Sequence, residues 1–252
     1  MKAASLLTGW TCRHLGDTAP GKTVTLPHDA MLAEPRTALS AGGTNTGWYE
    51  GYDYEYRRTL TVPENALADT HILEFEGVYH NAEVWLNGQK AAFRPYGYTN
   101  FYVDCAPYLH AGENELRVIA RNADQPNSRW YSGAGIYRPV TLWVGPEAHL
   151  LLDGLRVRTV SIDPPEVEVT AAASAPGTVQ LQVLDGTTVL ASASAEAGKP
   201  VRLKLPEAAL WSPEHPQLYT LQAAYGTDTA AARFGIRSLA WAGRPAAQRQ
   251  PD

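Results

Sequence analysis

The stretch Ala82-Glu83-Val84-Trp85-Leu86-Asn87-Gly88 decides the fold of this 252-residue chain, because a largely apolar run ends there in an Asn-Gly pair. Asn and Gly both tolerate positive φ, which the two central residues of a tight hairpin turn adopt. We therefore predict a strand that ends at Leu86, a turn at Asn87-Gly88 and a returning strand over Gln89 to Phe93.

Segments on both sides of this hairpin also have the pattern of strands. Apolar and charged residues alternate in His71–Glu76, and the segments 115–118 and 140–144 alternate in the same way. Alternation with a period of two is typical of a sheet that has one buried face and one solvated face. Because few windows have helical spacing, the sequence predicts an all-β protein.

A change in composition near Gly145-Pro146 indicates a domain boundary. The first part is aromatic and rich in loops, whereas the second is rich in Ala, Val and Thr and in short, regular strand patterns. Such strands are typical of an immunoglobulin-like sandwich, and the longer loops of the first part fit a jelly roll. We predict a jelly-roll β-sandwich over 1–146, a smaller immunoglobulin-like β-sandwich over 147–241, and a disordered tail over 242–252.

Charge and cysteine content exclude several classes of protein. The net charge is −5 and no basic block occurs, so the electrostatic footprint of a nucleic-acid-binding protein is missing. No apolar run approaches the roughly 20 residues of a membrane span, and the apolar run within 1–7 is too short for a signal peptide. Cys12 and Cys105 are expected to be free thiols, although spacing alone leaves their pairing open. We expect a cytoplasmic protein that binds neither nucleic acid nor membrane.

Several stretches carry a more specific signal. They are Thr25–Ala30, Tyr54–Pro63, Glu83–Gly88, Gly97–Phe101 with Asp104, and Asn127–Arg138. In this order they resemble the sugar-binding domain of family 2 glycoside hydrolases, the β-galactosidase and β-glucuronidase group. Further on, Trp211-Ser212-Pro213 and Arg233–Arg237 resemble the end of the second, immunoglobulin-like domain of that family. The resemblance covers residues 5–241.

The resemblance implies a role for the Asn127–Arg138 segment. In the family this loop leans over the active site of a catalytic barrel, and a polar residue just before its Trp can touch the substrate. Glycines in the loop let the backbone turn sharply and approach another surface closely. The carbohydrate-binding candidates are Asn45, Asn127, Ser128, Arg129, Trp130 and Tyr131. The alternative is that the loop is mainly an interdomain packing element, and the two roles are compatible.

For two other groups of residues, the sequence favours a structural role. His28-Asp29 has the composition of a functional dyad, but a His beside Asp in a loop more often satisfies backbone groups. Arg57 and Arg58 follow two tyrosines on a predicted strand, where one of them can pair with a carboxylate or stack on an aromatic ring.

The sequence offers no catalytic pair of its own. Retaining hydrolysis of a glycosidic bond uses two carboxylates about 5 Å apart, which in the family come from a (β/α)₈ barrel. The pairs Glu74/Glu76 and Glu113/Glu115 fall on solvated strand faces, and Asp53/Glu55 has little to favour it. No metal-ligand spacing or phosphate loop occurs, so we expect no catalytic residue, no metal site and no cofactor in this chain.

These observations predict the non-catalytic, N-terminal portion of a truncated β-galactosidase-like family 2 hydrolase that is inactive without its barrel. The expected partners are a β-galactoside-like carbohydrate and the catalytic barrel domain of the full-length relative. One alternative is a stand-alone carbohydrate-binding protein. Another is a protein-interaction module that uses the surface which would face the barrel.

Overall fold

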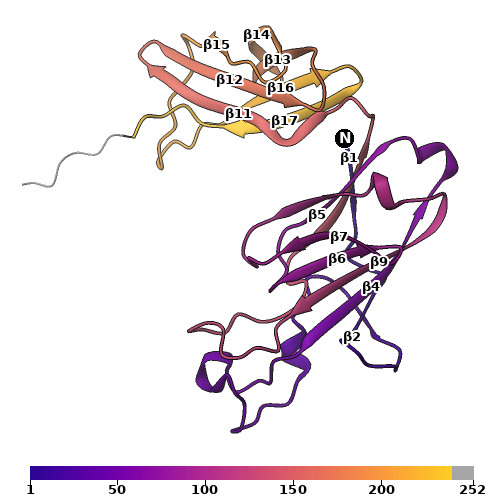
Figure 1. Ribbon diagram of the computed structural model, residues 1–252. Helices are drawn as coiled ribbons and strands as arrows, with labels where there is room; N and C mark the ends of the chain where they lie inside the picture. Colours follow the sequence, from indigo (N-terminus) through magenta and orange to yellow (C-terminus); the bar gives the residue numbers. More distant parts are fainter. Residues whose placement is uncertain (240–252) are drawn as a thin grey trace, which may run out of the picture. The chain divides into compact units, whose positions relative to one another are not determined.

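The computed structural model describes residues 1–239 and contains two compact units, one of Lys2–Glu147 and one that begins at Ala148. Both are built from antiparallel strands packed as sandwiches, which confirms the predicted all-β fold class (Figure 1). No helix among the described residues is long and apolar enough to cross a membrane. The predicted tail at 242–252, with residues 240 and 241, lies outside the described residues.

The first unit packs a four-stranded sheet, in the order β1-β10-β5-β8, against a six-stranded sheet in the order β3-β2-β4-β9-β6-β7. The strands are β1 (Lys2–Ser5), β2 (Trp10–His14), β3 (Lys22–Val24), β4 (Asp53–Val62), β5 (Thr70–Phe75), β6 (Ala82–Leu86), β7 (Gln89–Arg94), β8 (Phe101–Asp104), β9 (Gly112–Arg121) and β10 (Val140–Gly145). The 3-10 helices η1 (Ala30–Ala33), η2 (Gly43–Thr46), η3 (Glu64–Ala66) and η4 (Ala106–Tyr108) lie in the connections between them.

The predicted hairpin is the β6–β7 pair. Asn87 and Gly88 have φ of 49° and 78°, as a two-residue hairpin turn requires. The side chain of Asn87 also connects strands, because its Nδ2 donates to Asn114 Oδ1 at 2.7 Å and its Oδ1 accepts from the Glu115 nitrogen at 2.8 Å. The Asn-Gly pair therefore both turns the chain and ties the turn to β9.

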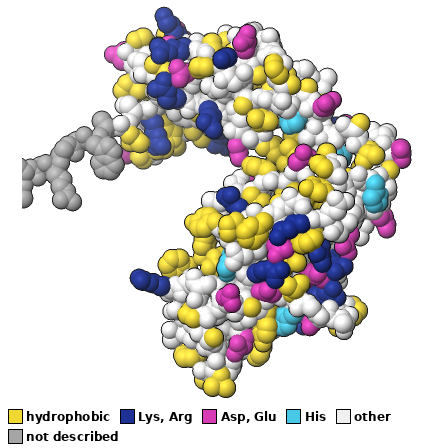
Figure 2. Space-filling view, in the orientation of Figure 1, with side chains coloured by type: hydrophobic (Ala, Val, Ile, Leu, Met, Phe, Trp, Pro, Cys, Tyr) yellow, Lys and Arg dark blue, Asp and Glu magenta, His cyan; other side chains and the backbone are white. Residues whose placement is uncertain are grey.

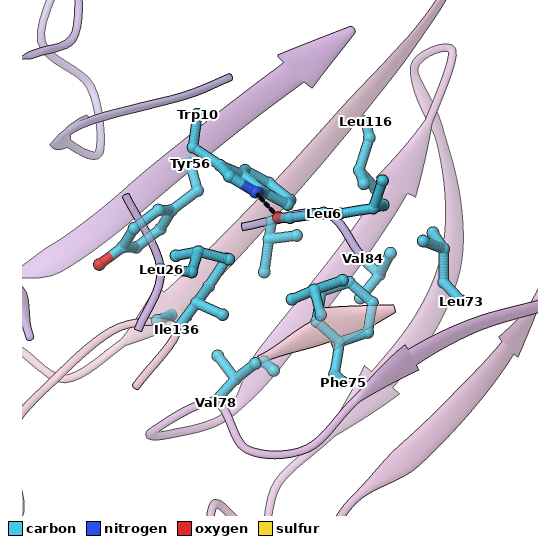
Figure 3. Packing of buried hydrophobic residues seen from close by; sticks show 14 of the residues in the cluster. Leu6, Trp10, Leu26, Tyr56, Leu73, Phe75, Val78, Val84, Leu116 and Ile136 are labelled. Atoms are coloured by element: carbon cyan, nitrogen blue, oxygen red, sulfur yellow. Dashed lines mark hydrogen bonds between the residues drawn. The ribbon is translucent and has the colours of Figure 1, made fainter. Parts of the chain in front are cut away.

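The core of the first unit lies between its two sheets (Figure 3). Trp10, Tyr56 and Leu116 from the six-stranded sheet and Phe75 from the four-stranded sheet are fully buried. The indole nitrogen of Trp10 donates to the Leu6 carbonyl oxygen at 2.6 Å, which satisfies the polar group that enters the core with the ring. Burial of each such side chain contributes about 2 kcal/mol.

The outer face of the six-stranded sheet carries a network of charges around the buried carboxylate of Glu55. Glu55 is 3% exposed, and its Oε1 accepts from Nε of Arg13 at 2.8 Å and from Nε of Arg57 at 2.9 Å. Arg57 also pairs with Glu115 at 2.7 Å, while the guanidinium of Arg117 lies 4.7 Å from the centre of a neighbouring indole ring. Figure 2 shows acidic and basic side chains interleaved on this unit. One of the two arginines singled out in the sequence, Arg57, is thus held by carboxylates.

The second unit packs a three-stranded sheet, in the order β11-β12-β15, against a four-stranded sheet in the order β14-β13-β16-β17. The strands are β11 (Leu150–Ile162), β12 (Pro165–Ala173), β13 (Thr178–Asp185), β14 (Thr188–Glu196), β15 (Val201–Lys204), β16 (Tyr219–Tyr225) and β17 (Asp228–Phe234). Its two sequence motifs meet in space, because the Trp211 nitrogen donates to the Ile236 carbonyl oxygen at 2.8 Å and the Arg237 guanidinium lies 4.6 Å from the centre of the Trp211 ring.

Cys12 and Cys105 are both free and buried in the first unit, as expected from the sequence. Burial raises the pKa of the Cys12 thiol to about 11 and that of the Cys105 thiol to about 12. Both groups are therefore protonated at neutral pH.

The charge network around Glu55 predicts a dependence of stability on pH. Burial alone would raise the pKa of Glu55, but hydrogen bonds from Arg57 and Arg13 outweigh burial and lower it below its ordinary value. Ionised Glu55 therefore stabilises the fold at neutral pH, and this stabilisation is lost as the pH falls through the folded-state pKa. Glu55→Gln is expected to cost about 2 kcal/mol at pH 7 and much less at pH 3, measured by urea unfolding. Glu113→Gln, at an exposed position, is the control; equal losses for Glu55→Gln at the two pH values would contradict the prediction.

Candidate carbohydrate site

The connection between β9 and β10 covers residues 122–139 and extends beyond the ends of the strands (Figure 1). Backbone hydrogen bonds hold its second half. Tyr79 and Gly135 exchange a pair of bonds of 3.0 and 2.8 Å, and the His28 nitrogen donates to the Ile136 carbonyl oxygen at 2.9 Å. The loop is therefore fixed by two segments that precede it by many residues.

The carboxylate of Asp29 is the main side-chain anchor of this loop. Its Oδ1 accepts from the Met31 nitrogen at 3.1 Å, where Asp29 caps η1, and from the Ala134 nitrogen at 3.0 Å. Its Oδ2 accepts from the Tyr131 hydroxyl at 2.7 Å. Burial raises the pKa of Tyr131, and the hydrogen bond and negative charge of Asp29 raise it further. Asp29 thus satisfies groups of both segments, which is the structural role expected for the His28-Asp29 pair.

The neighbouring side chain of that pair, His28, joins the loop to the core. Its Nδ1 lies 2.8 Å from the hydroxyl oxygen of Tyr56, a fully buried residue of β4. Burial lowers the pKa of His28 and raises that of Tyr56. Gly135 packs against the same hydroxyl with φ of 102°, and a Cβ there would lie 2.0 Å from it. Only glycine fits at this point of the loop.

Asn127, at the start of the motif, is surrounded by hydrogen-bond partners. Its Nδ2 lies 2.9 Å from Asn122 Oδ1, 2.9 Å from the Asp124 carbonyl oxygen and 3.1 Å from His80 Nε2. Its Oδ1 accepts from the Tyr79 hydroxyl at 3.2 Å. These contacts use both amide hydrogens, so Asn127 organises the first half of the loop and offers a ligand chiefly the free lone pair of its oxygen.

The four residues that follow Asn127 form the tip of the loop. The Ser128 hydroxyl donates to the Trp130 carbonyl oxygen, and Arg129 is exposed. Trp130 is 60% exposed, and Tyr131 is partly exposed although its hydroxyl is bound. Two large aromatic rings therefore face solvent from a loop whose backbone is fixed.

Asn45, the remaining candidate, is half-buried in η2. The η2 segment approaches the loop through Tyr49, whose ring centre lies 6.0 Å from that of Tyr131. Within the described residues no hydrogen bond joins the Asn45 side chain to the loop. The structure therefore brings the η2 segment beside the loop and gives the Asn45 side-chain amide no hydrogen-bond partner among residues 1–239.

Several residues of this region were not predicted as site residues. The Tyr98 hydroxyl oxygen accepts a hydrogen bond from the Trp130 indole nitrogen at 3.1 Å. The Tyr79 ring contacts those of Tyr98 and His80 in tilted arrangements, at centre distances of 5.3 and 4.8 Å. Tyr98 falls within a motif of the resemblance, which could have marked it. No sequence motif marks Tyr79 and His80, because only folding brings them into contact with the loop.

The buried carboxylates of the first unit are ion-paired. Besides Glu55, Glu83 receives a hydrogen bond from Arg121 at 2.6 Å. Burial would raise the pKa of Glu83, but the bonds and charge of Arg121 lower it overall. A general acid of a glycosidase needs a raised pKa, so Glu55 and Glu83 are unsuited to that role. Among residues 1–239 no group of three or more His, Cys, Asp or Glu side chains is placed to hold a metal ion.

Two β-sandwich units, the first of which carries a fixed aromatic loop, place the chain among the all-β sandwich proteins, and family models identify it further. The model for the glycosyl hydrolase 2 galactose-binding domain-like family matches residues 10–140, and that for glycosyl hydrolases family 2 matches 154–237. The chain belongs to glycoside hydrolase family 2, which confirms the resemblance in its sequence. It comprises the N-terminal, non-catalytic β-domains of such a protein.

Individual relatives agree with this assignment. The chain is 37% identical over 236 residues to the beta-galactosidase BoGH2A of Bacteroides ovatus, covering 82% of the chain and 28% of that protein. Solved structures of a family 2 member from Bacteroides cellulosilyticus and of a beta-glycosidase from Bacteroides vulgatus each superpose with a TM-score of 0.84 at 26% identity. Each match covers 96% of this chain, and 36% and 34% of those chains. The chain spans about a quarter of the length of the first curated relatives it matches, 23% and 28%.

Because Gly135 lies so close to Tyr56, a methyl group added at this position is expected to lower the stability of the first unit strongly. Gly135→Ala is expected to destabilise the first unit by about 3 kcal/mol, because backbone strain and overpacking add. In thermal unfolding the midpoint should fall by about 8 °C. Gly112→Ala is the matched control, since Gly112 also has positive φ, 91°, but open space around its Cβ position. Equal losses in the two variants would exclude the steric cause.

Because the Asp29 carboxylate binds backbone amides, its removal is expected to change the local dynamics of the backbone. Asp29→Ala is expected to speed hydrogen exchange at the Met31 and Ala134 amides about tenfold or more, because both lose a charged acceptor. Tyr131→Phe removes the third bond and leaves these two amides bound, so their exchange should change only slightly. Unchanged protection of the Ala134 amide in Asp29→Ala would show that the loop is held by other contacts.

Proposed function

We propose that this chain shapes the substrate site of a β-galactosidase-like family 2 glycosidase, with sugar contacts from the β9–β10 loop and from Asn45. The observation that carries the proposal is the fixed loop: Asp29 and Tyr79 hold its backbone while Trp130 and Tyr131 present exposed rings. A ring fixed before binding loses little freedom when a sugar covers it. The name of the Bacteroides ovatus relative supports a β-galactoside as the substrate.

The proposed residue roles differ along the loop. Trp130 and Tyr131 cover apolar faces of a sugar, while Ser128 and Arg129 offer polar groups at the rim. Asn127 holds the loop in shape and offers an oxygen lone pair, and Asn45 contributes an amide that has no partner within the described residues. All six sequence candidates therefore keep a place in the proposal.

Hydrolysis itself is assigned to the barrel domain of the complete protein. A retaining mechanism uses a nucleophilic carboxylate and an acid/base carboxylate about 5 Å apart. The lowered pKa values of Glu55 and Glu83 support the view that the acids of these two sandwiches serve the fold. In this proposal the chain by itself positions sugar and turns over none.

A stand-alone carbohydrate-binding protein is the second candidate function. The same exposed rings on a fixed loop favour it over a role purely in protein contacts, because the rings lie beside hydroxyl and amide groups that a sugar can use. The interaction module remains the third possibility. We also propose a cytoplasmic location, which the two free, buried thiols support.

Activity and binding measurements test the leading proposal together. The purified chain is expected to release no nitrophenol from p-nitrophenyl β-galactoside. In ¹H–¹⁵N spectra, amide signals of residues 122–138 should shift at millimolar galactose, and Asn45→Ala or Trp130→Ala should weaken the affinity about tenfold. Leu39→Ala, at a strongly exposed position, is the control. Turnover abolished by Glu55→Gln, or no loop shift at saturating sugar, would contradict the proposal.

A further inference from the structure

Two loops of the first unit form a continuous aromatic surface beside the candidate site. Tyr96 and Tyr98 come from the β7–β8 connection, and Trp130 comes from the β9–β10 loop. The Trp130 indole nitrogen donates to the Tyr98 hydroxyl at 3.1 Å, and the ring centres of Tyr96 and Tyr98 lie 5.6 Å apart at 63°. We call Tyr96, Tyr98 and Trp130 the aromatic platform.

The platform is exposed at its two ends and anchored in its middle. Trp130 is 60% and Tyr96 57% exposed, while the half-buried Tyr98 packs on Tyr79 with ring centres 5.3 Å apart. Gly97, between the two tyrosines, has no room for a side chain, because a Cβ there would lie 2.6 Å from the Tyr79 ring. Contacts with Tyr79 therefore fix the middle of the platform, while the rings of Tyr96 and Trp130 remain exposed to solvent.

A second contact fixes the β7–β8 connection to the candidate site. The Tyr137 hydroxyl donates to the Gly97 carbonyl oxygen at 2.7 Å. Tyr79, which supports Tyr98, also donates its hydroxyl hydrogen to Asn127 Oδ1 at 3.2 Å. The platform is thus connected through Tyr79 to the Asn127 end of the loop.

The chemistry of the platform matches a carbohydrate. Its three side chains are uncharged and combine apolar ring faces with two phenol hydroxyls, so apolar and hydrogen-bonding groups lie side by side as they do on a pyranose. The angle of 63° between the tyrosine rings prevents one flat ligand from covering both. Two linked sugar rings, each free to tilt about the glycosidic bond, can cover one ring each.

We propose that the aromatic platform is an additional subsite that binds further units of an oligosaccharide, so that the substrate class is an oligosaccharide or polysaccharide fragment and not a simple galactoside. This inference rests on the proposed sugar contact at the loop. The sugar unit held near Asn127 reaches Trp130, and further units lie across Tyr98 and Tyr96 in turn. The platform therefore makes affinity increase with the number of sugar units.

The length of the sugar provides the test. In ¹H–¹⁵N spectra of the chain, the indole signal of Trp130, assigned with Trp130→Phe, is followed during titration with galactose and with β-1,4-galactotetraose. Both sugars are expected to shift the indole signal, and the tetrasaccharide is expected to bind at least tenfold more tightly than galactose. Tyr96→Ala should reduce tetrasaccharide affinity about tenfold and leave galactose affinity unchanged. Phe93→Ala, 55% exposed and covered by Lys90, is the matched control and should change neither.

The outcomes separate this inference from the proposed function. If both sugars shift the loop signals with equal affinity and Tyr96→Ala has no effect, the platform subsite is refuted while the proposed function stands. If neither sugar shifts any loop signal, both fail. If Tyr96→Ala and Trp130→Ala instead abolish a self-association seen by sedimentation and leave sugar binding unaltered, the platform is a protein interface and the inference is wrong.

Discussion

The hydrogen bonds of one carboxylate, Asp29, determine the conformation on which the candidate site depends. They connect the segment before η1 to the β9–β10 loop, more than a hundred residues later in the chain. A long connection without regular secondary structure has high conformational entropy, so it adopts one shape only when tertiary contacts hold it. Asp29 supplies two such contacts, to Tyr131 and Ala134, and each uses the charge of the carboxylate. Without that carboxylate, the loop would keep its backbone bonds to Tyr79 and His28 but lose both of these contacts.

The sandwich beneath gives those contacts a rigid base. Tyr56 lies on a central strand, is fully buried, and carries the hydroxyl against which His28 and Gly135 pack. The second half of the loop is thus fixed both to the core and to the Asp29 carboxylate, while its aromatic tip faces solvent. This division between a rigid scaffold and a functional loop is common in β-sandwiches, where the loops can vary while the strands preserve the fold.

Local chemistry in the sequence predicted the strands and the hairpin, because Asn87-Gly88 and the alternating residues of β5 depend on neighbours in the chain. The carbohydrate candidates came from the resemblance, and they remain proposals. The partnership of Asp29 with Ala134 was out of reach, since no short-range pattern encodes a contact between such distant residues. The hydrogen bond from the Tyr79 hydroxyl to Asn127 could not be predicted for the same reason. Glu55 looked like one of several strand carboxylates. Arg57 follows it on β4, but only the pairing of β2 with β4 brings Arg13 beside it.

The two cysteines have a practical consequence. Both thiols are buried and held in the neutral form by their raised pKa values, so neither reacts readily with maleimides. A cysteine introduced at an exposed loop position such as Arg129 would therefore be the main site of labelling by a fluorophore or spin label. Distances from that probe would report the conformation of the loop without prior removal of either native sulfur atom.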